Sequence, residues 1–412
     1  MRPDPTSPAA APAAATSSTT RDTERERGTL SVTTEQPAVA RAIETVESHL
    51  HPTPSWAVED HPMPTGREEI WRFTPIKRFA DLLNPADEIG TLDWSLAPGA
   101  EGVTVTELTA EQARALAVEA PVDRVSALAA EQSVYRTHIE VPAEAELTKP
   151  IVFTAKGNEG QARDHYVLSI GRFAKATVVV KFEGKADYAE KLDVIVGDGA
   201  ALNLITVQDW AEGAVHGGQR SLRVGRDAQV KTITVSIGGD VRLQENSRFD
   251  GPGGSLEQFG LYLVDAGQHI EHRLFVDHNA PHTKSNVDYR GALQGKGAHS
   301  VWIGDVLIRK VAEGIETYES NKNLVLTDGC QADSVPNLEI ETGEIAGAGH
   351  ASTTGRFDDE QLFYLRSRGI PESEARRLVV HGFFWDIIRR IGIEDIEEHL
   401  RDIVENELQV VQ

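Results

Sequence analysis

The sequence has very little cysteine: Cys330 is the only one among 412 residues. One thiol excludes a disulfide within the chain and any metal site built from several of its own thiolates. A site that needs more thiolates would take them from another chain. Cys330 lies beside a predicted turn, where a small and weakly polar residue fits. We therefore favour a structural role for it over a role as sulfur acceptor or thiolate ligand.

Positive charge is also scarce, with 41 Lys and Arg against 64 Asp and Glu and a net charge of −23. This balance argues against binding to nucleic acid or to an anionic membrane, because both need a basic face. No run approaches the roughly 18 consecutive apolar residues of a membrane-spanning helix. Residues 1–32 are rich in Ala, Pro, Ser and Thr and lack the features of a secretion signal, so we predict a disordered tail and a cytoplasmic protein.

Motifs for nucleotide binding and nucleophilic catalysis are incomplete. Residues 291–297 resemble a Walker A loop, but with three intervening residues instead of four and Gly in place of the magnesium-binding Ser or Thr. Residues 347–352 match only half of a dinucleotide fingerprint and precede no βαβ unit. There is no Gly-x-Ser-x-Gly sequence either. We therefore expect no nucleotide bound by this chain and no catalytic residues in it.

Residues 33–132 are predicted to form a mostly helical N-terminal domain. Apolar residues recur at helical spacing between residues 39 and 50. Thr109 and Gln112 form a predicted capping box that opens an Ala-rich helix reaching to about residue 120. Asp123 can cap a second helix that ends near Gln132.

Residues 133–345 have a sequence pattern that predicts a β-solenoid. Short runs of alternating Val, Ile, Thr and polar residues, separated by Gly and Asp, predict strands over 135–141, 151–155, 166–170 and 177–182. A Gly-x-x-Ala element repeats every 26 to 28 residues, which predicts one strand–turn unit per coil, with small residues at the corners. A β-sandwich stays open as an alternative because the later spacings are irregular. The copies begin at Gly171, Gly197, Gly225 and Gly251, with looser ones at Gly295 and Gly329.

The last part of the chain, residues 346–412, is predicted to be a helical domain with exposed apolar surface. One helix covers residues 358–368 and ends at Gly369, which suits a left-handed stop. Pro371 fits the start of the next helix, and a third, acidic helix covers about residues 396–404. The apolar face predicted for the second helix consists of Ala375, Leu378, Val379, Phe383, Ile387 and Ile391.

Histidines are the remaining candidates for chemistry. His269, His272, His278 and His282 lie in a predicted strand and turn, and His269 would share a face with Glu271. We interpret these four as a solvent-facing polar ladder and not as a zinc site. His350 stands apart in a Gly/Ala-rich loop over residues 343–355, where its ring could approach another chain or a metal. Taken alone, a single histidine still favours a structural role.

Residues 350–370, HASTTGRFDDEQLFYLRSRGI, resemble the C-terminal signature of the SufB/SufD family, the scaffold proteins of the SUF iron–sulfur cluster assembly system. Residues 69–76 resemble the family's N-terminal entry and residues 336–340 its last strand, so the resemblance extends from about residue 35 to the end. It implies a right-handed parallel β-helix core between helical N- and C-terminal domains. It also implies a SufD-like rather than a SufB-like chain, because SufB carries cysteines that are missing here.

The resemblance implies a non-catalytic scaffold subunit. It would pair with SufB through the β-helix core and bind the SufC ATPase through the C-terminal helices, about residues 371–411. His350 matches the histidine expected to face SufB across their interface and to help ligate the transient iron–sulfur cluster. Some members carry a cysteine two residues earlier, where this chain has Ala348. SufB would then supply more of the ligands.

A carbohydrate-active hydrolase or lyase with a β-helix fold is the alternative from another functional class. Such enzymes need a carboxylate pair or a basic residue in an open groove. Acidic residues are plentiful here, but none forms such a motif.

Overall fold

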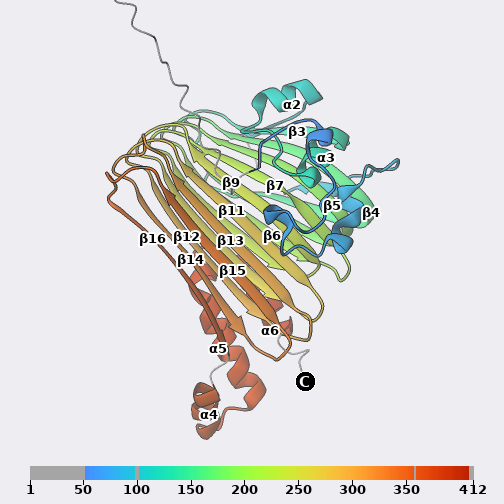
Figure 1. Cartoon of the computed structure of the whole chain (residues 1–412), viewed down its shortest axis with the longest axis vertical. Helices are drawn as coiled ribbons and strands as arrows, with labels where there is room; N and C mark the ends of the chain where they lie inside the picture. The colour runs from blue at the N-terminus through green and yellow to red at the C-terminus, as the bar shows by residue number, and fades with distance from the viewer. Residues whose placement is uncertain (1–51, 98–101, 357–358, 408–412) are drawn as a thin grey trace, which may run out of the picture. The chain divides into compact units, whose positions relative to one another are not determined.

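The computed structural model describes residues 52–97, 102–356 and 359–407, and the predicted tail and the predicted helix over 39–50 lie outside them. The fold is a parallel β-solenoid with short helices before it and three helices after it (Figure 1). None of the helices in these ranges is both long and apolar enough to cross a membrane.

The segment before the solenoid mixes short helices with two strands. Its capping boxes at Thr109 and Asp123 are both present, so the two helix starts are confirmed. The expectation of a mostly helical segment is met only in part, because β1 and β2 pair antiparallel with β4 and β3 of the solenoid. The elements are η1 Val58–Asp60, η2 Glu69–Trp71, η3 Ile76–Phe79, α1 Ala80–Leu83, β1 Asp93–Leu96, β2 Thr104–Glu107, α2 Ala110–Leu116 and α3 Arg124–Gln132.

Each coil of the solenoid contains two strands, one on each of two facing sides. The hydrogen-bonded order runs β15-β13-β11-β9-β7-β5-β6-β8-β10-β12-β14-β16, so the chain alternates between the sides and the long β5 joins them. The prediction of one strand–turn unit per repeat is therefore wrong. The strands are β3 Tyr135–Val141, β4 Ile151–Ile170, β5 Lys175–Val196, β6 Ala201–Trp210, β7 Val215–Val224, β8 Gln229–Ile237, β9 Asp240–Phe249, β10 Ser255–Val264, β11 His269–His278, β12 Lys284–Leu293, β13 His299–Ile308, β14 Glu316–Val325, β15 Gln331–Ile340 and β16 Gly347–Arg356.

The Gly-x-x-Ala repeat marks one corner of this stack. A Cβ atom on Gly197 would lie 2.8 Å from the backbone nitrogen of Arg172, and one on Gly225 would lie 2.7 Å from the carbonyl oxygen of Val196. The need for small residues at the corner is thus confirmed. Gly295 and Gly329 follow β12 and β14 and lie at the opposite corner, so they are not copies of this element.

The irregular later spacings come from longer turns. The strands β6, β8 and β10 begin at residues 201, 229 and 255, but β12, β14 and β16 begin at 284, 316 and 347. Pairing stays parallel throughout these strands, for example between β12 and β14, so the β-sandwich alternative is wrong.

Three of the five apolar clusters in the described residues join the main parts of the fold. The largest fills the space between the two sides of the solenoid. The N-terminal segment packs on the outer side of β5, where Trp71, Leu82 and Val125 meet Ala189. The C-terminal helices α5 Glu372–Ile388 and α6 Glu394–Glu407 pack on the outer side of β5, β6, β8, β10 and β12 (Figure 1).

The predicted apolar face of α5 is confirmed in part, since Ala375 and Ile387 are fully buried whereas Leu378 is 47 % exposed. The prediction missed Val380, Phe384 and Ile388, which are also buried. The preceding helix, α4 Asp359–Ser367, ends at Gly369, whose φ of +85° confirms the predicted left-handed stop. Phe363 on α4 is 74 % exposed, so the C-terminal helices do carry uncovered apolar surface.

Candidate functional site

His350 lies on a strand and not in a loop. It is the fourth residue of β16, the last strand of the solenoid, and its side chain is 44 % exposed. The loop expected over residues 343–355 is therefore wrong for most of its length. The expectation that residues 336–340 form the last strand is also wrong, because β15 is followed by β16.

Glu319 is the neighbour of His350 on β14. The two residues are directly paired in the register of β14 and β16, and the Nδ1 atom of His350 lies 3.8 Å from Oε1 of Glu319. Glu319 is buried, and its Oε1 atom has no hydrogen-bond partner within the described residues. Gly304 on the facing side leaves room for this carboxyl group, since a Cβ there would come 2.5 Å from Glu319 Oε2.

Burial raises the pKa of Glu319 to about 8, and the nearby Asp305 carboxylate contributes to the rise. Glu319 is therefore mostly protonated at neutral pH. A bound cation would favour its ionised form and displace the proton. His350 and Glu319 therefore place two possible metal ligands at the same end of the solenoid. These are an imidazole nitrogen and a carboxyl group that would lose its proton when a cation binds.

Two ligands do not complete a metal site. No group of three or more His, Cys, Asp or Glu side chains suited to hold a metal ion occurs within the described ranges. Any metal bound by His350 and Glu319 would need further ligands from outside these residues.

The site lies at an open end of the solenoid. Among the described strands, β15 and β16 each have a neighbour on one side only. Over residues 347–355 the only ionisable side chain on β16 is His350, so the charges that usually protect an edge strand are missing. Pro336 lies within β15, and its missing N–H suits an unpaired edge but weakens pairing there with a further strand. The edge of β16 is therefore the one better suited to pairing with another strand.

The four clustered histidines do not form a solvent-facing ladder, so that interpretation is wrong. His269, His272 and His278 are buried, and only His282 is exposed. His272 lies inside the solenoid beside Tyr262 and Tyr289, and burial lowers its pKa to about 3. The prediction that His269 shares a face with Glu271 is confirmed by a 3.1 Å contact between His269 Nε2 and Glu271 Oε2.

Cys330 and the loop over residues 291–297, the two other candidates from the sequence, both lie at turns of the solenoid. The Sγ atom of Cys330 donates to the carbonyl oxygen of Gly295 at 3.3 Å and packs at the edge of the inner core. This placement agrees with the structural interpretation of the cysteine. Residues 291–297 leave β12 and enter β13 through a turn, whereas a phosphate-binding loop opens a helix.

Sequence reasoning missed Glu319. The residue stands 31 positions before His350, and no motif contains both. The signal that could have found it is the length of the later coils, because β14 and β16 also begin 31 residues apart.

The comparisons with known proteins agree with this architecture. Residues 152–383 match the family described as SUF system FeS cluster assembly, SufBD core domain. A SufBD family protein of iron–sulfur cluster assembly from Mycobacterium tuberculosis is 46% identical over 370 residues, covering 87% of this chain and 92% of the relative. The SufD proteins of Escherichia coli and Bacillus subtilis are each 24% identical, covering 82% and 65% of this chain and 88% and 63% of those proteins.

The chain belongs to the SufBD family of the SUF iron–sulfur cluster assembly system. Its resemblance to SufD is supported by the two SufD relatives.

Proposed function

We propose that this chain is a SufD-like, non-catalytic scaffold subunit of a cytoplasmic SufB–SufC–SufD complex. The observation that carries the proposal is an incomplete ligand pair, His350 and Glu319, on an unpaired end of the solenoid. Family membership links the chain to iron–sulfur cluster assembly. A SufB-like chain would align its own strands with β15 and β16 and supply the missing thiolate ligands.

In this arrangement the nascent iron–sulfur cluster is cargo held between two chains. His350 supplies a neutral nitrogen ligand from the solvent-exposed side of the edge. Glu319 supplies an oxygen ligand and loses its proton when iron binds, because the cation replaces the proton as the partner of the buried carboxylate. Since Ala348 replaces the cysteine of other members, Glu319 provides the second ligand from this chain.

The C-terminal helices are the proposed binding surface for a SufC-like ATPase. Phe363, Tyr364 and Leu378 are large apolar side chains that are 74 %, 55 % and 47 % exposed. Movement of α5 would reach the solenoid through Arg290 of β12, which donates from Nη1 to the carbonyl oxygen of Phe383 at 2.9 Å. Closure of two ATPase copies would thereby shift β12 and, through it, β14 and β16.

Co-expression with SufB-like and SufC-like chains from the same source, followed by native mass determination, tests the assembly. We expect one copy of this chain, one SufB and two SufC. If this chain purifies alone under gentle conditions, the partner proposal is wrong.

Substitutions in the ligand pair then test the cargo site. In the intact complex, His350→Ala and Glu319→Gln should each lower the iron and acid-labile sulfide retained after anaerobic assembly by at least threefold. Ser352→Ala is the matched control, since Ser352 lies two residues further along β16, and it should have no effect. Full cluster content in both variants, with the complex intact, would refute the ligand role.

A further inference from the structure

A large cavity lies in the first coils of the solenoid, at the end away from His350. Its volume is about 620 Å³, and its walls come from β1 and β2 and from the strands β3 to β7. Pockets for small molecules commonly measure about 300–1,000 Å³. Leu96, Val105 and Tyr135 line it and are 41 %, 49 % and 48 % exposed, so apolar side chains form a rim that solvent can reach.

The walls are unusually aromatic. Aromatic residues make up 6% of the chain but five of the 21 residues that line this cavity, namely Trp94, Tyr135, Phe153, Tyr166 and Phe182. The Trp94 ring centroid lies 4.7 Å from that of Tyr166 and 6.0 Å from that of Phe182, in tilted and edge-on arrangements. Such arrangements accept another ring well, because ring edges and faces attract one another.

The cavity ends at a buried ion pair. Arg220 and Glu190 both line it, and Arg220 Nε lies 2.5 Å from Glu190 Oε1. Arg220 also donates from Nη1 to Thr206 Oγ1 at 2.8 Å. The two charges offset each other, and together they present both hydrogen-bond donors and acceptors at the inner end of an otherwise apolar space.

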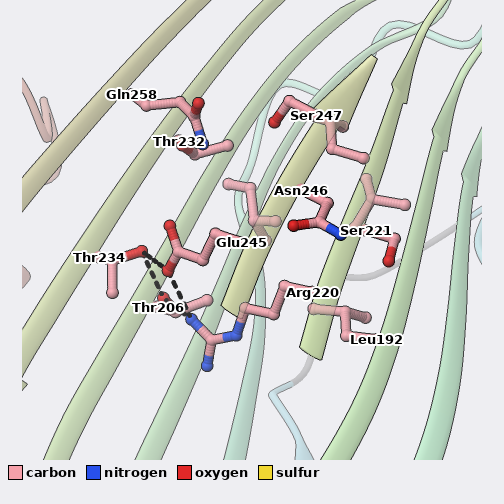
Figure 2. A pocket seen from close by; sticks show the side chains of 13 residues that line it. Leu192, Thr206, Arg220, Ser221, Thr232, Thr234, Glu245, Asn246, Ser247 and Gln258 are labelled. Atoms are coloured by element: carbon pink, nitrogen blue, oxygen red, sulfur yellow. Dashed lines mark hydrogen bonds and ion pairs between the residues drawn. The ribbon is translucent and has the colours of Figure 1, made fainter. Parts of the chain in front are cut away.

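A smaller chamber continues beyond this ion pair. It shares Leu192, Leu204, Thr206 and Arg220 with the large cavity and has a volume of about 30 Å³, enough for a water molecule. Figure 2 shows Arg220 and Glu245 near Thr206 and Thr234 at one end and Thr232 beside Gln258 at the other.

Three side-chain atoms in this chamber need hydrogen-bond partners. Thr232 Oγ1, Ser247 Oγ and Gln258 Oε1 are buried without a partner within the described residues. Buried polar atoms are rarely left unpaired, so bound water or a ligand group is expected there. The end of the chamber away from Arg220 can therefore hold bound water.

The cavity opens to solvent through its rim, so a ligand can reach the ring-lined walls without the solenoid unfolding. The ring-lined walls, the reachable rim and the polar inner end are the features expected of a site that is filled by a ligand.

We propose that this cavity binds one uncharged aromatic small molecule, with its rings among Trp94, Tyr166 and Phe182 and a polar substituent directed at Arg220 and Glu190. Anions are disfavoured because Glu190 and Arg220 offset each other, which leaves Asp93 as the uncompensated charge in the lining, and because the chain carries a net charge of −23. This site is independent of the proposed cluster site, since it lies at the opposite end of the solenoid and uses none of its residues.

Fluorescence titration of the full chain with dansylamide, an uncharged naphthalene sulfonamide, tests the proposal. We expect saturable binding of one dansylamide per chain and transfer of excitation energy from tryptophan, with Trp94→Phe lowering the transferred emission. Absence of saturable binding would overturn the proposal.

Two cavity-filling variants and one surface variant locate the bound probe. Leu204→Trp and Val180→Phe each add volume to the cavity wall and should weaken dansylamide binding at least tenfold. Phe363→Ser removes an exposed apolar side chain elsewhere and should leave binding unchanged. Circular dichroism identifies which filling variant folds, and unchanged affinity in a folded one would overturn the proposal.

A charged probe tests the specificity. The anion 1-anilinonaphthalene-8-sulfonate has the same naphthalene core and should bind this site at least tenfold more weakly than dansylamide. Equal affinity for the two probes, abolished together by Leu204→Trp, would overturn the preference for an uncharged ligand.

Discussion

The two sides of the solenoid hold their helices by different interactions. The N-terminal segment is attached to the outer side of β5, β7, β9 and β11 through buried polar groups. Arg242 Nη1 lies 2.5 Å from Asp123 Oδ2, Thr74 Oγ1 donates to Glu271 Oε2 at 2.7 Å, and the backbone N–H of Val118 donates to Asp193 at 2.8 Å. These contacts are directional and desolvated, so they specify one placement.

On the other side, α5 and α6 pack on the sheet mainly through apolar side chains. Val380, Phe384 and Ile387 meet Ile205, Ile233 and Phe259 in a continuous cluster. The accompanying polar contacts are more exposed, such as His399 with Asp209 at 3.3 Å. Apolar packing is less directional than buried ion pairing, so this side can tolerate small displacements. The difference agrees with the proposal that the C-terminal helices, rather than the N-terminal segment, transmit movement to the solenoid.

Among these predictions, substitution of Arg242 should lower the free energy of unfolding the most. Arg242→Leu leaves the buried Asp123 and Glu271 carboxylates without their main cation, and we expect a loss of about 3–5 kcal/mol in the free energy of unfolding. Urea denaturation measures it. Arg72→Leu is the control, since the Arg72–Glu69 pair is exposed, and its loss should stay within about 0.5 kcal/mol. Equal losses would contradict the buried polar attachment.

Truncating the apolar attachment should have a local effect. Ile387→Ala removes a fully buried side chain between α5 and the sheet and should cost about 2–4 kcal/mol. Hydrogen exchange should rise in α5 and α6 while protection in β6 and β8 is retained. Leu378→Ala, on the exposed face of α5, serves as the control. Simultaneous loss of protection in the strands would show that the helices are not a separate cooperative unit.

As the pH falls, the attachment of the N-terminal segment should lose stability before that of the C-terminal helices. Burial alone would raise the pKa of Glu271, but the Arg242 guanidinium, His269 and Arg273 outweigh it and lower the pKa to about 2. The ionised Glu271 therefore contributes stability that is complete above about pH 4.5 and is lost as the pH falls toward 2, up to about 3 kcal/mol.

Hydrogen exchange at pH 5 and pH 3 checks this expectation. Protection factors, which correct for the slower intrinsic exchange at lower pH, should fall more in α3 than in α5 on acidification, and Glu271→Gln should remove the difference. A larger fall in α5 would reverse the comparison.

The smallest effect is expected for the exposed ion pair on α6. Asp209→Asn removes the partner of His399, whose side chain is 44 % exposed, and should change the free energy of unfolding by less than about 1 kcal/mol. Thermal unfolding at low and high salt measures it. A larger loss would mean that electrostatics contributes more to this side than its exposure implies.

The parts of the fold that the sequence predicted best depend on neighbouring residues. Thr109 with Gln112 and Asp123 with Ser126 cap their helices through contacts three residues apart, and Gly369 meets a local backbone requirement. The Gly-x-x-Ala repeat predicted the solenoid because four successive turns, from Gly171 to Gly251, form the same corner. The number of strands in a coil was missed because the repeat marks only one of the two corners.

The parts that failed depend on residues far apart in the chain. Nothing near His272 in sequence shows that Tyr289 will stand beside it inside the solenoid. The face of α5 was predicted only in part, because the sheet beneath the helix, and not the helix alone, decides that Val380 and Phe384 are covered and Leu378 is not. His350 could be singled out by resemblance, whereas its neighbour Glu319 follows only from the coil length.

The unpaired, nearly uncharged edge of β16 also limits the concentration at which this chain stays soluble in a cell. A newly made copy presents this edge to every other copy, so surplus chains are expected to associate with one another through it. Where the proposed SufB-like chain covers the edge, matched synthesis of the two chains would prevent this association from the start. The solubility of this chain would then follow the supply of the proposed partner more closely than its own stability.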